Sequence, residues 1–428
     1  MTTTPTLPRH DAHWSEWVTY GRAWAQQSYR SSTPATRPAP AAPAPTRSPA
    51  FGATKWTSDD TETVQDWRAA TLESAPVGDS SSAGLRSWPI TFYAYREETP
   101  GPRWQALWEV TRSAYLAFYR RDGLAQRPTL RESRAALAEH MPELMPTYER
   151  LVDLTGGTGN GASNTGDEDD ESSDTAASLL TMWRLPIFAA GCSQVAIGGE
   201  APTLSRNYDY DPNLFEGVIA STNYSGKRAV LGTSDMLWGL VDGMNEDGLA
   251  ISMTYGGRKG GGVGFAIPLV VRYLLEVCGT VEQACERLRG LPVAQAYNLA
   301  MVDRSGARAT VFVAPGEEPE VRDHAVSTNH RLDRVEHPEI AGPLASLERQ
   351  QDLSQRVQQS RDVNIDDVQG WLGQEPMFAN RYSSGFGTLY TVSYEPKSGT
   401  AQYRWGQRTL TRTFSDGEAE FPVVLRGH

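Results

Sequence analysis

The stretch Phe188–Gly199, FAAGCSQVAIGG, places a cysteine directly after a glycine, where an alternating apolar run begins. Alternation with a period of two is typical of a β-strand, so we expect Cys192 near the start of a strand. A thiol in this position can serve as a nucleophile, but a cysteine nucleophile usually needs a neighbouring base. The nearest histidines in the sequence are His140 and His324, and neither adjoins this stretch.

Length, charge and composition limit the classes of protein to consider. The chain has 428 residues, enough for one large domain with attachments or for two domains. Its net charge of −12 argues against a nucleic-acid partner, which requires clustered lysine and arginine. We find neither an apolar window long enough for a transmembrane helix nor a signal-peptide core. Three cysteines are too few for a disulfide framework, so we expect a cytoplasmic protein.

Two segments lack the composition of a packed domain. Residues 1–55 are rich in Pro, Ala, Thr and Ser and bury too little apolar surface to offset chain entropy, which predicts a disordered tail. Residues 156–178 combine glycine and serine with six carboxylates, which predicts a long, solvated acidic loop.

Strands and helices are predicted in blocks rather than in strict alternation, which favours antiparallel sheets with packed helices. Apolar periodicity and turn residues predict helices over 103–119, 129–154, 265–277, 281–291 and 344–372. The same criteria predict strands over 88–95, 193–199, 200–210, 239–255, 297–302, 308–313 and 387–406, several of them as hairpins.

Common metal and phosphate motifs are absent from the sequence. It contains no HExxH and no CxxC, so we expect no metal site, and nothing in it predicts a cofactor. The glycine cluster at 256–264, GGRKGGGVG, does not match a phosphate-binding loop and is interpreted as a mobile loop at the mouth of a site. Cys278 and Cys285 lie on predicted helices among apolar neighbours, so we expect both thiols to be structural.

Short motifs follow Cys192 in a characteristic order. They are RNYDYDP from Arg206, LWGLVDGMNEDGLA before Tyr255, IPLVVRYLLE, STNH ending at His330, and TLYTVSYEP, with HMPEL upstream at residues 140–144. In order and spacing these motifs resemble the N-terminal-nucleophile hydrolases of the acyl-coenzyme A:6-aminopenicillanic acid acyltransferase family, which are related to choloylglycine hydrolases and penicillin V acylases. The resemblance runs from about Phe92 to Trp405.

The resemblance implies an α+β fold, a four-layer αββα sandwich of antiparallel sheets, with Cys192 at the end of an inner strand. In such enzymes the peptide bond before the nucleophile is cut, which here is the bond between Gly191 and Cys192. The freed α-amino group then acts as the general base, and its pKa of roughly 7.7 to 8.0 suits that role without a histidine. The new chain would have 428 − 191 = 237 residues. The resemblance thus divides the chain after the tail at Cys192, into an N-terminal segment, residues 56–191, and a catalytic chain, residues 192–428.

The resemblance also implies roles for individual residues. Arg206 and Asp209 would position the α-amine and hold the thiolate, where the alternative is a strand-edge ion pair. The Asn329 side chain and the backbone N–H of Tyr255 would form an oxyanion hole, where the alternatives are a turn-forming Asn and a sheet aromatic. Arg381, in NRYSSG, is a candidate for a late arginine near the nucleophile.

The implied reaction is attack of Cys192 on a linear amide to form a thioester, from which water or an amine takes the acyl group. Expected partners are a small-molecule amide or short peptide, with acyl-coenzyme A a candidate donor, and neither nucleic acid nor membrane. The chains would form a heterodimer after self-cleavage, or a homo-oligomer. Two alternatives are a conventional thiol hydrolase in which His324 or His330 activates Cys192, and a non-catalytic relative that binds partners through its tail and acidic loop.

Overall fold

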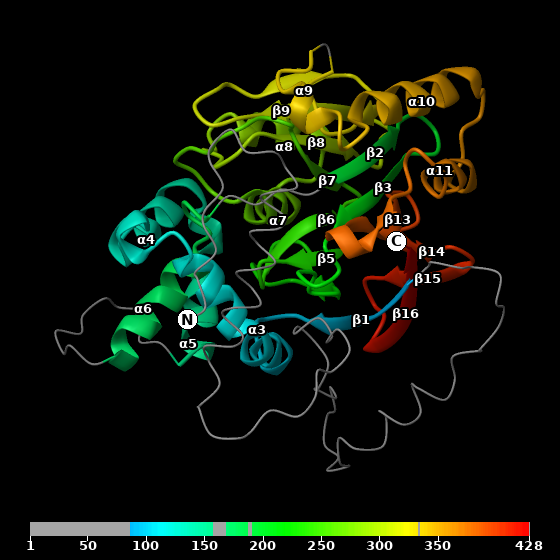
Figure 1. The fold of residues 1–428 in the computed structure, drawn as a ribbon. Coiled ribbons are helices and arrows are strands. Elements are labelled where there is room, and N and C mark those ends of the chain that lie inside the picture. The colour runs from blue at the N-terminus through cyan, green and yellow to red at the C-terminus, as the bar shows by residue number, and fades with distance from the viewer. Residues whose placement is uncertain (1–85, 157–167, 187–190, 333, 428) are drawn as a thin grey trace.

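A computed structural model of the chain describes residues 86–156, 168–186, 191–332 and 334–427 (Figure 1). The predicted tail, residues 1–55, lies outside these ranges, as do residues 56–85 of the predicted N-terminal segment. Among the described residues, no helix has both the length and the apolar character needed to cross a membrane.

Two sheets form the centre of the molecule. Within the described residues the larger sheet has nine strands, in the order β10 (Glu320–Arg322), β9 (Arg308–Val313), β8 (Tyr297–Val302), β7 (Ala250–Tyr255), β6 (Gly239–Asn245), β5 (Val230–Asp235), β4 (Val218–Thr222), β1 (Arg86–Glu97) and β16 (Ala419–Gly427). The smaller sheet has the order β11 (Val326–Ser327), β2 (Gly191–Ile197), β3 (Thr203–Tyr210), β13 (Phe386–Glu395), β14 (Thr400–Trp405) and β15 (Arg408–Thr413), with β12 (Asn380–Arg381) also paired to β13. These neighbours pair antiparallel, except β1 and β4, which are parallel.

The two sheets pack face to face, and helices cover their outer faces. β2 and β3 contact β7 and β8 across the interface between the sheets. Helix α7 (Ile267–Val277) packs on β5, β6 and β7, whereas α10 (Ser346–Gln359) and α11 (Ile365–Leu372) pack on the smaller sheet (Figure 1). Apolar side chains alternate between the two faces of such strands and fill the space between the sheets. The predicted four-layer αββα sandwich is confirmed.

The N-terminal segment contributes one strand and a group of helices. These helices are α3 (Pro102–Arg120), α4 (Leu130–His140), α5 (Met145–Leu154) and α6 (Glu168–Leu180), and α6 contacts each of the other three. Strand β1 lies inside the larger sheet, paired with β4 on one side and β16 on the other. Residues on both sides of Cys192 therefore build the same core.

Short elements connect these layers. They are α8 (Val281–Leu288), α9 (Pro338–Ala341) and the 3₁₀ turns η1 (Leu124–Gln126), η2 (Pro142–Leu144) and η3 (Tyr382–Ser384). The helices and strands predicted from sequence are present, although the predicted helix over 344–372 is divided into α10 and α11. Strands β4, β5, β10, β11, β12, β15 and β16 were not predicted. The chain does not end with the predicted hairpin, because β16 returns to the larger sheet and pairs with β1.

The prediction of an acidic loop over 156–178 is wrong for its second half, where α6 forms. Residues 157–167 lie outside the described ranges. The end of α6 carries Ala176, Ala177, Leu179 and Leu180, all buried, and the hydroxyl of Tyr148 donates to the carbonyl of Ala177. Apolar anchoring at the C-terminal end of α6 explains a helix where composition indicated a loop.

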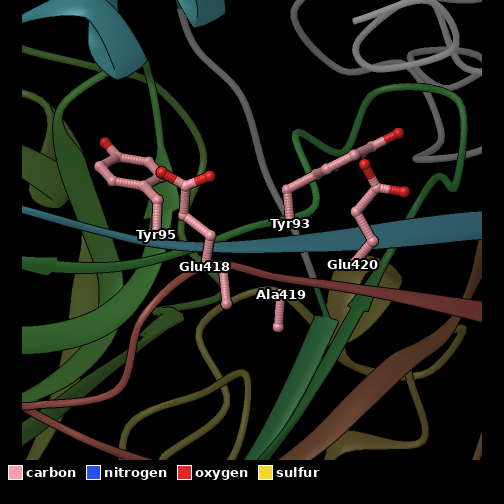
Figure 2. A pocket seen from close by; sticks show the side chains of 6 residues that line it. Tyr93, Tyr95, Glu418, Ala419 and Glu420 are labelled. Atoms are coloured by element: carbon pink, nitrogen blue, oxygen red, sulfur yellow. The ribbon is translucent and has the colours of Figure 1, made fainter. Parts of the chain in front are cut away.

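A hollow of about 210 Å³ lies over β1 and the start of β16 (Figure 2). Its lining comprises Tyr93, Ala94, Tyr95, Glu418, Ala419 and Glu420. None of these residues was predicted to carry chemistry, and the strands that form the hollow belong to the larger sheet rather than to the sheet of Cys192.

Candidate active site

Cys192 is the second residue of β2, a strand buried along nearly its whole length. Gly191 pairs with Asp209 and Cys192 with Tyr208 on the neighbouring strand β3. A side chain at position 191 would collide with a neighbour, since a Cβ built there would lie 2.4 Å from Cζ of Phe386. Close packing of this aromatic ring therefore requires the glycine that precedes the cysteine.

The sulfur of Cys192 is bonded by a guanidinium: Nη2 of Arg206 lies 2.6 Å from Sγ. The backbone of Asp209 and the hydroxyl of Thr254 also lower the pKa of the thiol. Burial raises the pKa of the Cys192 thiol; the Arg206 guanidinium opposes this shift and the Asp209 carboxylate adds to it. Arg206 is therefore the largest influence that favours a thiolate here.

Arg206 is held in place by a second buried ion pair. Its Nη1 lies 3.2 Å from Oδ2 of Asp242, and both side chains are fully buried. The hydroxyls of Tyr390 and Tyr394 each donate to Asp242 at 2.6 Å. The ion pair and the two tyrosine hydroxyls that hold Asp242 therefore fix the position of the Arg206 guanidinium.

Asp209 lies beside the same thiol with different partners. Its Oδ1 accepts a hydrogen bond of 2.7 Å from the hydroxyl of Thr388, and its Oδ2 lies 3.5 Å from Nη1 of Arg349. Burial raises the pKa of Asp209 to about 6, against the lowering influence of Arg349, Thr388 and Arg206. This carboxyl group can therefore exchange a proton near neutral pH.

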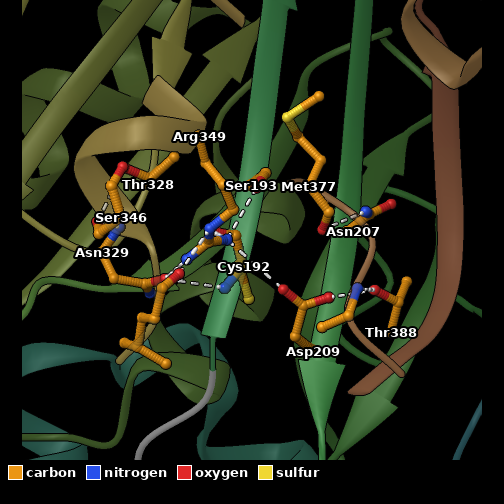
Figure 3. Close-up of polar contacts among 12 residues, drawn as sticks. Cys192, Ser193, Asn207, Asp209, Thr328, Asn329, Ser346, Arg349, Met377 and Thr388 are labelled. Atoms are coloured by element: carbon orange, nitrogen blue, oxygen red, sulfur yellow. Dashed lines mark hydrogen bonds and ion pairs between the residues drawn. The ribbon is translucent and has the colours of Figure 1, made fainter. Parts of the chain in front are cut away.

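Arg349, on α10, joins the parts of the site and was not predicted from sequence (Figure 3). Its Nη1 donates to the carbonyl of Cys192 at 2.7 Å and to the hydroxyl of Ser193 at 2.8 Å. Its Nη2 donates to Oδ1 of Asn329 at 2.7 Å. One buried guanidinium thus fastens the nucleophile strand to the Asn329 carboxamide.

The sequence does contain a signal for Arg349. In the predicted helix, Ser346, Arg349 and Leu353 recur at spacings of three and four residues, which puts them on one face. All three are buried in the structure. An arginine on the buried face of an amphipathic helix has to find a buried partner, and this indicates a site rather than a solvated surface.

The Asn329 carboxamide bridges Cys192 and β7. Its Oδ1 accepts from the backbone N–H of Cys192 at 3.1 Å. Its Nδ2 donates to the hydroxyl of Thr254 at 2.7 Å and to the carbonyl of Tyr255 at 3.0 Å. The backbone of Tyr255 therefore reaches the site, whereas its side-chain hydroxyl donates to the carbonyl of Arg258.

Arg381 is exposed and forms no hydrogen bond or ion pair with Cys192, Asp209 or Asn329 in the described part of the chain. Its Nη2 donates to the carbonyl of Pro343 at 3.1 Å, and its guanidinium lies 5.1 Å from the ring centroid of Phe386. Among the contacts of the described residues, the buried arginine beside Cys192 and Asn329 is Arg349 instead. Arg381 still lowers the pKa of Asp209 through its charge, so it borders the site without bonding the nucleophile.

Neither histidine of the alternative mechanism bonds the thiol. Nδ1 of His324 lies 2.7 Å from the carbonyl of Val326, and Nδ1 of His330 lies 2.7 Å from the hydroxyl of Ser346. Burial lowers the pKa of His330 to about 4. Within the ranges that the structure describes, no group of three or more His, Cys, Asp or Glu side chains could hold a metal ion.

A family model for acyl-coenzyme A:6-aminopenicillanic acid acyl-transferase matches residues 197–410, half of the chain. No curated protein matches. Similar solved structures include conjugated bile acid hydrolase from Clostridium perfringens (13% identity over 54% of this chain and 96% of that one, TM-score 0.35). Others are penicillin V acylase from Agrobacterium tumefaciens (16%, 51% and 84%, TM-score 0.36) and the N-acylethanolamine-hydrolyzing acid amidase ortholog of Caenorhabditis elegans (13%, 48% and 93%, TM-score 0.36). By its family match, the chain belongs to the acyl-coenzyme A:6-aminopenicillanic acid acyl-transferase family and is an amide hydrolase or acyltransferase.

Proposed function

We propose that Cys192 is the nucleophile of a self-processing enzyme that hydrolyses or transfers the acyl group of a linear amide. The observation that carries the proposal is the position of its sulfur, 2.6 Å from the buried guanidinium of Arg206 and one residue after Gly191. A thiolate attacks the amide carbonyl, the amine leaves with a proton, and the acyl group remains on sulfur as a thioester. Water or a second amine then takes the acyl group.

Self-cleavage uses the same chemistry on the chain itself. The sulfur of Cys192 attacks the carbonyl carbon of Gly191, the C–N bond breaks, and the nitrogen takes up a proton to become an α-amine. Water hydrolyses the resulting thioester and restores the thiol. Asp209 is suited to accept the thiol proton, because its carboxyl group lies beside Cys192 and its pKa is raised to about 6.

After cleavage the new α-amine replaces the N–H that lies 3.1 Å from Oδ1 of Asn329. That oxygen holds the amine, which acts as the general base for the amide substrate. The oxyanion role of Asn329 requires Nδ2 to exchange its bond with the carbonyl of Tyr255 for one with the substrate oxygen. The backbone N–H of Tyr255 supplies the second donor in this proposal.

The two chains remain together after cleavage. Strand β1 belongs to the N-terminal piece and is hydrogen-bonded on both sides, to β4 and β16, which belong to the C-terminal piece. Separating the pieces would break two ladders of backbone hydrogen bonds in the larger sheet, where β1 lies between β4 and the edge strand β16. The processed enzyme is therefore a heterodimer of two chains that share one core.

The substrate is a small-molecule amide or a short peptide, and acyl-coenzyme A is a candidate acyl donor. Hydrolysis of penicillin V, a conjugated bile acid and an N-acylethanolamine provides three probes of different acyl groups. Quenching with acid during turnover and mapping peptide masses should place the acyl group on Cys192. An acyl group found on another residue, or full activity after complete alkylation of Cys192, would contradict the proposal.

Cys278 and Cys285 provide the internal comparison for alkylation. Burial raises the pKa of Cys278 to about 11 and also raises the pKa of Cys285, and neither thiol has a guanidinium bonded to its sulfur in the part of the chain described. Iodoacetamide should therefore modify Cys192 of the processed enzyme first, and activity should fall in step with one label. Faster labelling of Cys278 would reverse the assignment.

A further inference from the structure

The ring of Phe386 lies against Gly191, on the acyl side of the bond that the proposed self-cleavage breaks. A Cβ built on Gly191 in the L configuration would lie 2.4 Å from Cζ and 2.6 Å from Cε2 of the ring, and 3.4 Å from Cβ of Asp209. Carbon atoms in contact lie about 3.5 to 4.0 Å apart, so the first two approaches are collisions. Gly191 does not have the positive φ that favours glycine, so space rather than backbone conformation requires it here.

The ring has little room to move aside. Phe386 is buried in a small apolar cluster with Tyr255, Ile340 and Leu344. Its backbone pairs with Arg381 of β12, and the guanidinium of Arg381 lies 5.1 Å from the ring centroid. A methyl group pushed against this ring would have to displace several packed groups, which is unfavourable in a close-packed interior.

We propose that Phe386 is a specificity-determining residue, which selects acyl groups that have no substituent in the position of an L side chain on the carbon next to the carbonyl. The favoured substrates are linear amides with a methylene at that carbon, as in glycyl, arylacetyl and straight-chain acyl groups. The inference rests on the proposed role of Cys192 as nucleophile and names the substrate class of the same site.

Self-cleavage and turnover form a thioester on the same sulfur. In self-cleavage the acyl group is that of Gly191, so Cα of Gly191 is the carbon next to the carbonyl. In turnover the substrate supplies the acyl group, and its carbonyl carbon has to reach the same buried Sγ of Cys192. Pairing of β2 with β3 holds that sulfur in place. The first acyl carbon of the substrate therefore lies where Cα of Gly191 lies before cleavage, and a branch on it meets the Phe386 ring.

The test measures acylation of Cys192 by the p-nitrophenyl esters of benzyloxycarbonyl-glycine, benzyloxycarbonyl-L-alanine and benzyloxycarbonyl-D-alanine. The thiolate attacks the ester carbonyl, p-nitrophenolate leaves, and the acyl group stays on sulfur as a thioester. Release of p-nitrophenolate gives the rate, which is divided by the rate of the same ester with free cysteine. Peptide masses after an acid quench show which residue carries the acyl group.

The glycine ester should acylate Cys192 about 10- to 200-fold faster than the L-alanine ester, the range expected for one methyl group in an apolar pocket. The D-alanine ester should also react faster than the L-alanine ester, because its methyl group points away from the ring.

Phe386→Leu tests the ring itself, because leucine keeps an apolar side chain but lacks the Cε2 and Cζ atoms that approach Gly191. The preference for glycine over L-alanine should fall about 10-fold or more in this variant. Phe312→Leu is the matched control. The rings of Phe386 and Phe312 are both buried, at 6% and 5% exposure, and the guanidinium of Arg331 lies 5.9 Å from the ring centroid of Phe312. This control should lose comparable stability in a thermal melt and keep the wild-type preference.

Self-cleavage provides a second measurement that uses no added substrate. Gly191→Ala places the colliding methyl group on the chain itself, so intact mass over time should show cleavage about 10-fold or more slower than in the wild-type chain. Adding Phe386→Leu to Gly191→Ala should restore much of the lost rate, whereas adding Phe312→Leu should not. A Gly191→Ala/Phe386→Leu chain as slow as Gly191→Ala would overturn the role of the ring.

The outcomes separate this inference from the proposed function. Acylation of Cys192 in the expected order, without hydrolysis of any amide, would count against the proposed function alone. If amides are hydrolysed through Cys192 but the glycine and L-alanine esters react equally, only the inference is wrong. An unchanged preference in Phe386→Leu would overturn it too, as would a protein in which none of the three esters acylates Cys192.

Discussion

Two buried polar clusters lie on either side of Tyr208, and their carboxyl groups have different partners. In the Cys192 site each carboxylate faces a guanidinium, Asp242 that of Arg206 and Asp209 that of Arg349. In the second cluster Glu216 and Asp235 are equally buried, but within the described residues no cation forms an ion pair with them. The hydroxyl of Tyr208 donates to Asp235, while its ring lies 4.8 Å from the guanidinium of Arg206.

The donors of the second cluster are hydroxyl and backbone groups. The hydroxyl of Tyr115, from α3, donates to Glu216 and lies 3.4 Å from Oδ1 of Asp235. The backbone N–H groups of Met236 and Leu237 donate to Asp235 and Glu216, at 2.8 Å and 2.7 Å respectively. A single hydroxyl proton shared by two carboxyl groups cannot neutralise either of them.

The difference lies in what offsets the burial of each carboxyl group. Two like charges without a cation cannot both persist in a low dielectric, so the second cluster keeps a proton. Burial and the neighbouring Asp235 raise the pKa of Glu216 to about 7, and burial raises the pKa of Asp235 to about 6. Burial also raises the pKa of Asp209 to about 6, but there Arg349, Thr388 and Arg206 oppose the shift. The site therefore pairs its carboxyl groups with cations, whereas neutral donors hold those of the second cluster.

The largest effect is expected from breaking the charge pairing of the site with Arg349→Met. The substitution leaves Asp209 buried beside the thiol without its nearest guanidinium and frees the carbonyl of Cys192. Removing one partner of a buried pair typically costs about 3 to 5 kcal/mol. We expect self-cleavage and turnover to fall by about 10³-fold or more, measured by intact mass over time and by amide hydrolysis.

Arg272→Met is the matched control, because Arg272 is another buried arginine and pairs with Glu276 at 2.7 Å outside the site. It should lower the melting temperature as much as Arg349→Met while leaving the thiol pKa of Cys192 unchanged. Equal losses of self-cleavage in the two variants would show that Arg349 acts only through stability.

The next largest effect is expected from Asn329→Ala. Loss of the carboxamide removes the oxyanion donor and the acceptor for the α-amine, so turnover should fall by about 10²-fold or more. The side chain is buried and hydrogen-bonded at both ends, so stability should fall too, by about 1 to 3 kcal/mol. Kinetics should be measured on the cleaved fraction, to separate turnover from processing.

Asn298→Ala separates the two contributions. Asn298 is also buried, and its Nδ2 donates to the carbonyls of Thr328 and His330, so a comparable loss of stability is expected without loss of a catalytic donor. If cleaved Asn329→Ala turns over substrate at nearly the wild-type rate and is only as unstable as Asn298→Ala, Asn329 has a structural role and not a catalytic one.

A smaller effect is expected from neutralising the second cluster with Glu216→Gln. The folded-state pKa values of Glu216 and Asp235 lie above their ordinary values, so the folded state binds more protons than the unfolded state. Their contribution to stability is therefore present below about pH 4 and is lost as pH rises through about 6 to 7. Each contributes about 3 kcal/mol to this loss by the conversion of pKa shift to free energy.

The measurement is the melting temperature between pH 4 and pH 8. The wild-type value should fall across this range, and Glu216→Gln, which keeps an acceptor without a titrating proton, should fall less. Glu276→Gln changes a buried carboxylate that has an arginine partner, so it should keep the wild-type dependence on pH. The same pH dependence in all three proteins would show that ionisation of Glu216 and Asp235 does not lower the stability of the folded state.

The order of motifs predicted most of the site, because strands fix the relative positions of residues in hairpins. Arg206 and Asp209 lie on the strand next to Cys192, as expected, and Asn329 reaches the backbone N–H of Cys192. Arg349 was not predicted, since it comes from a helix 157 residues after Cys192 and carries no local motif. Only tertiary packing brings such a residue to the nucleophile.

The remaining differences have the same origin. Thr254 precedes the predicted Tyr255 by one residue, and its hydroxyl accepts a hydrogen bond from Nδ2 of Asn329. Strand β15 belongs to the smaller sheet, whereas the next strand, β16, pairs with β1 in the larger sheet. This pairing joins the two ends of the described chain. Sequence periodicity predicts which residues share a face, but it does not predict which distant face they meet.

The central claim is tested most directly by intact-mass analysis of the purified protein beside Cys192→Ala. The account predicts two pieces from the wild-type chain, of 191 and 237 residues, with Cys192 as the new N-terminus, and a single chain of 428 residues from the variant. The two wild-type pieces should elute together under native conditions, because β1 joins them in one sheet. A wild-type chain that stays whole while it hydrolyses amides at full rate would falsify the free α-amine as base.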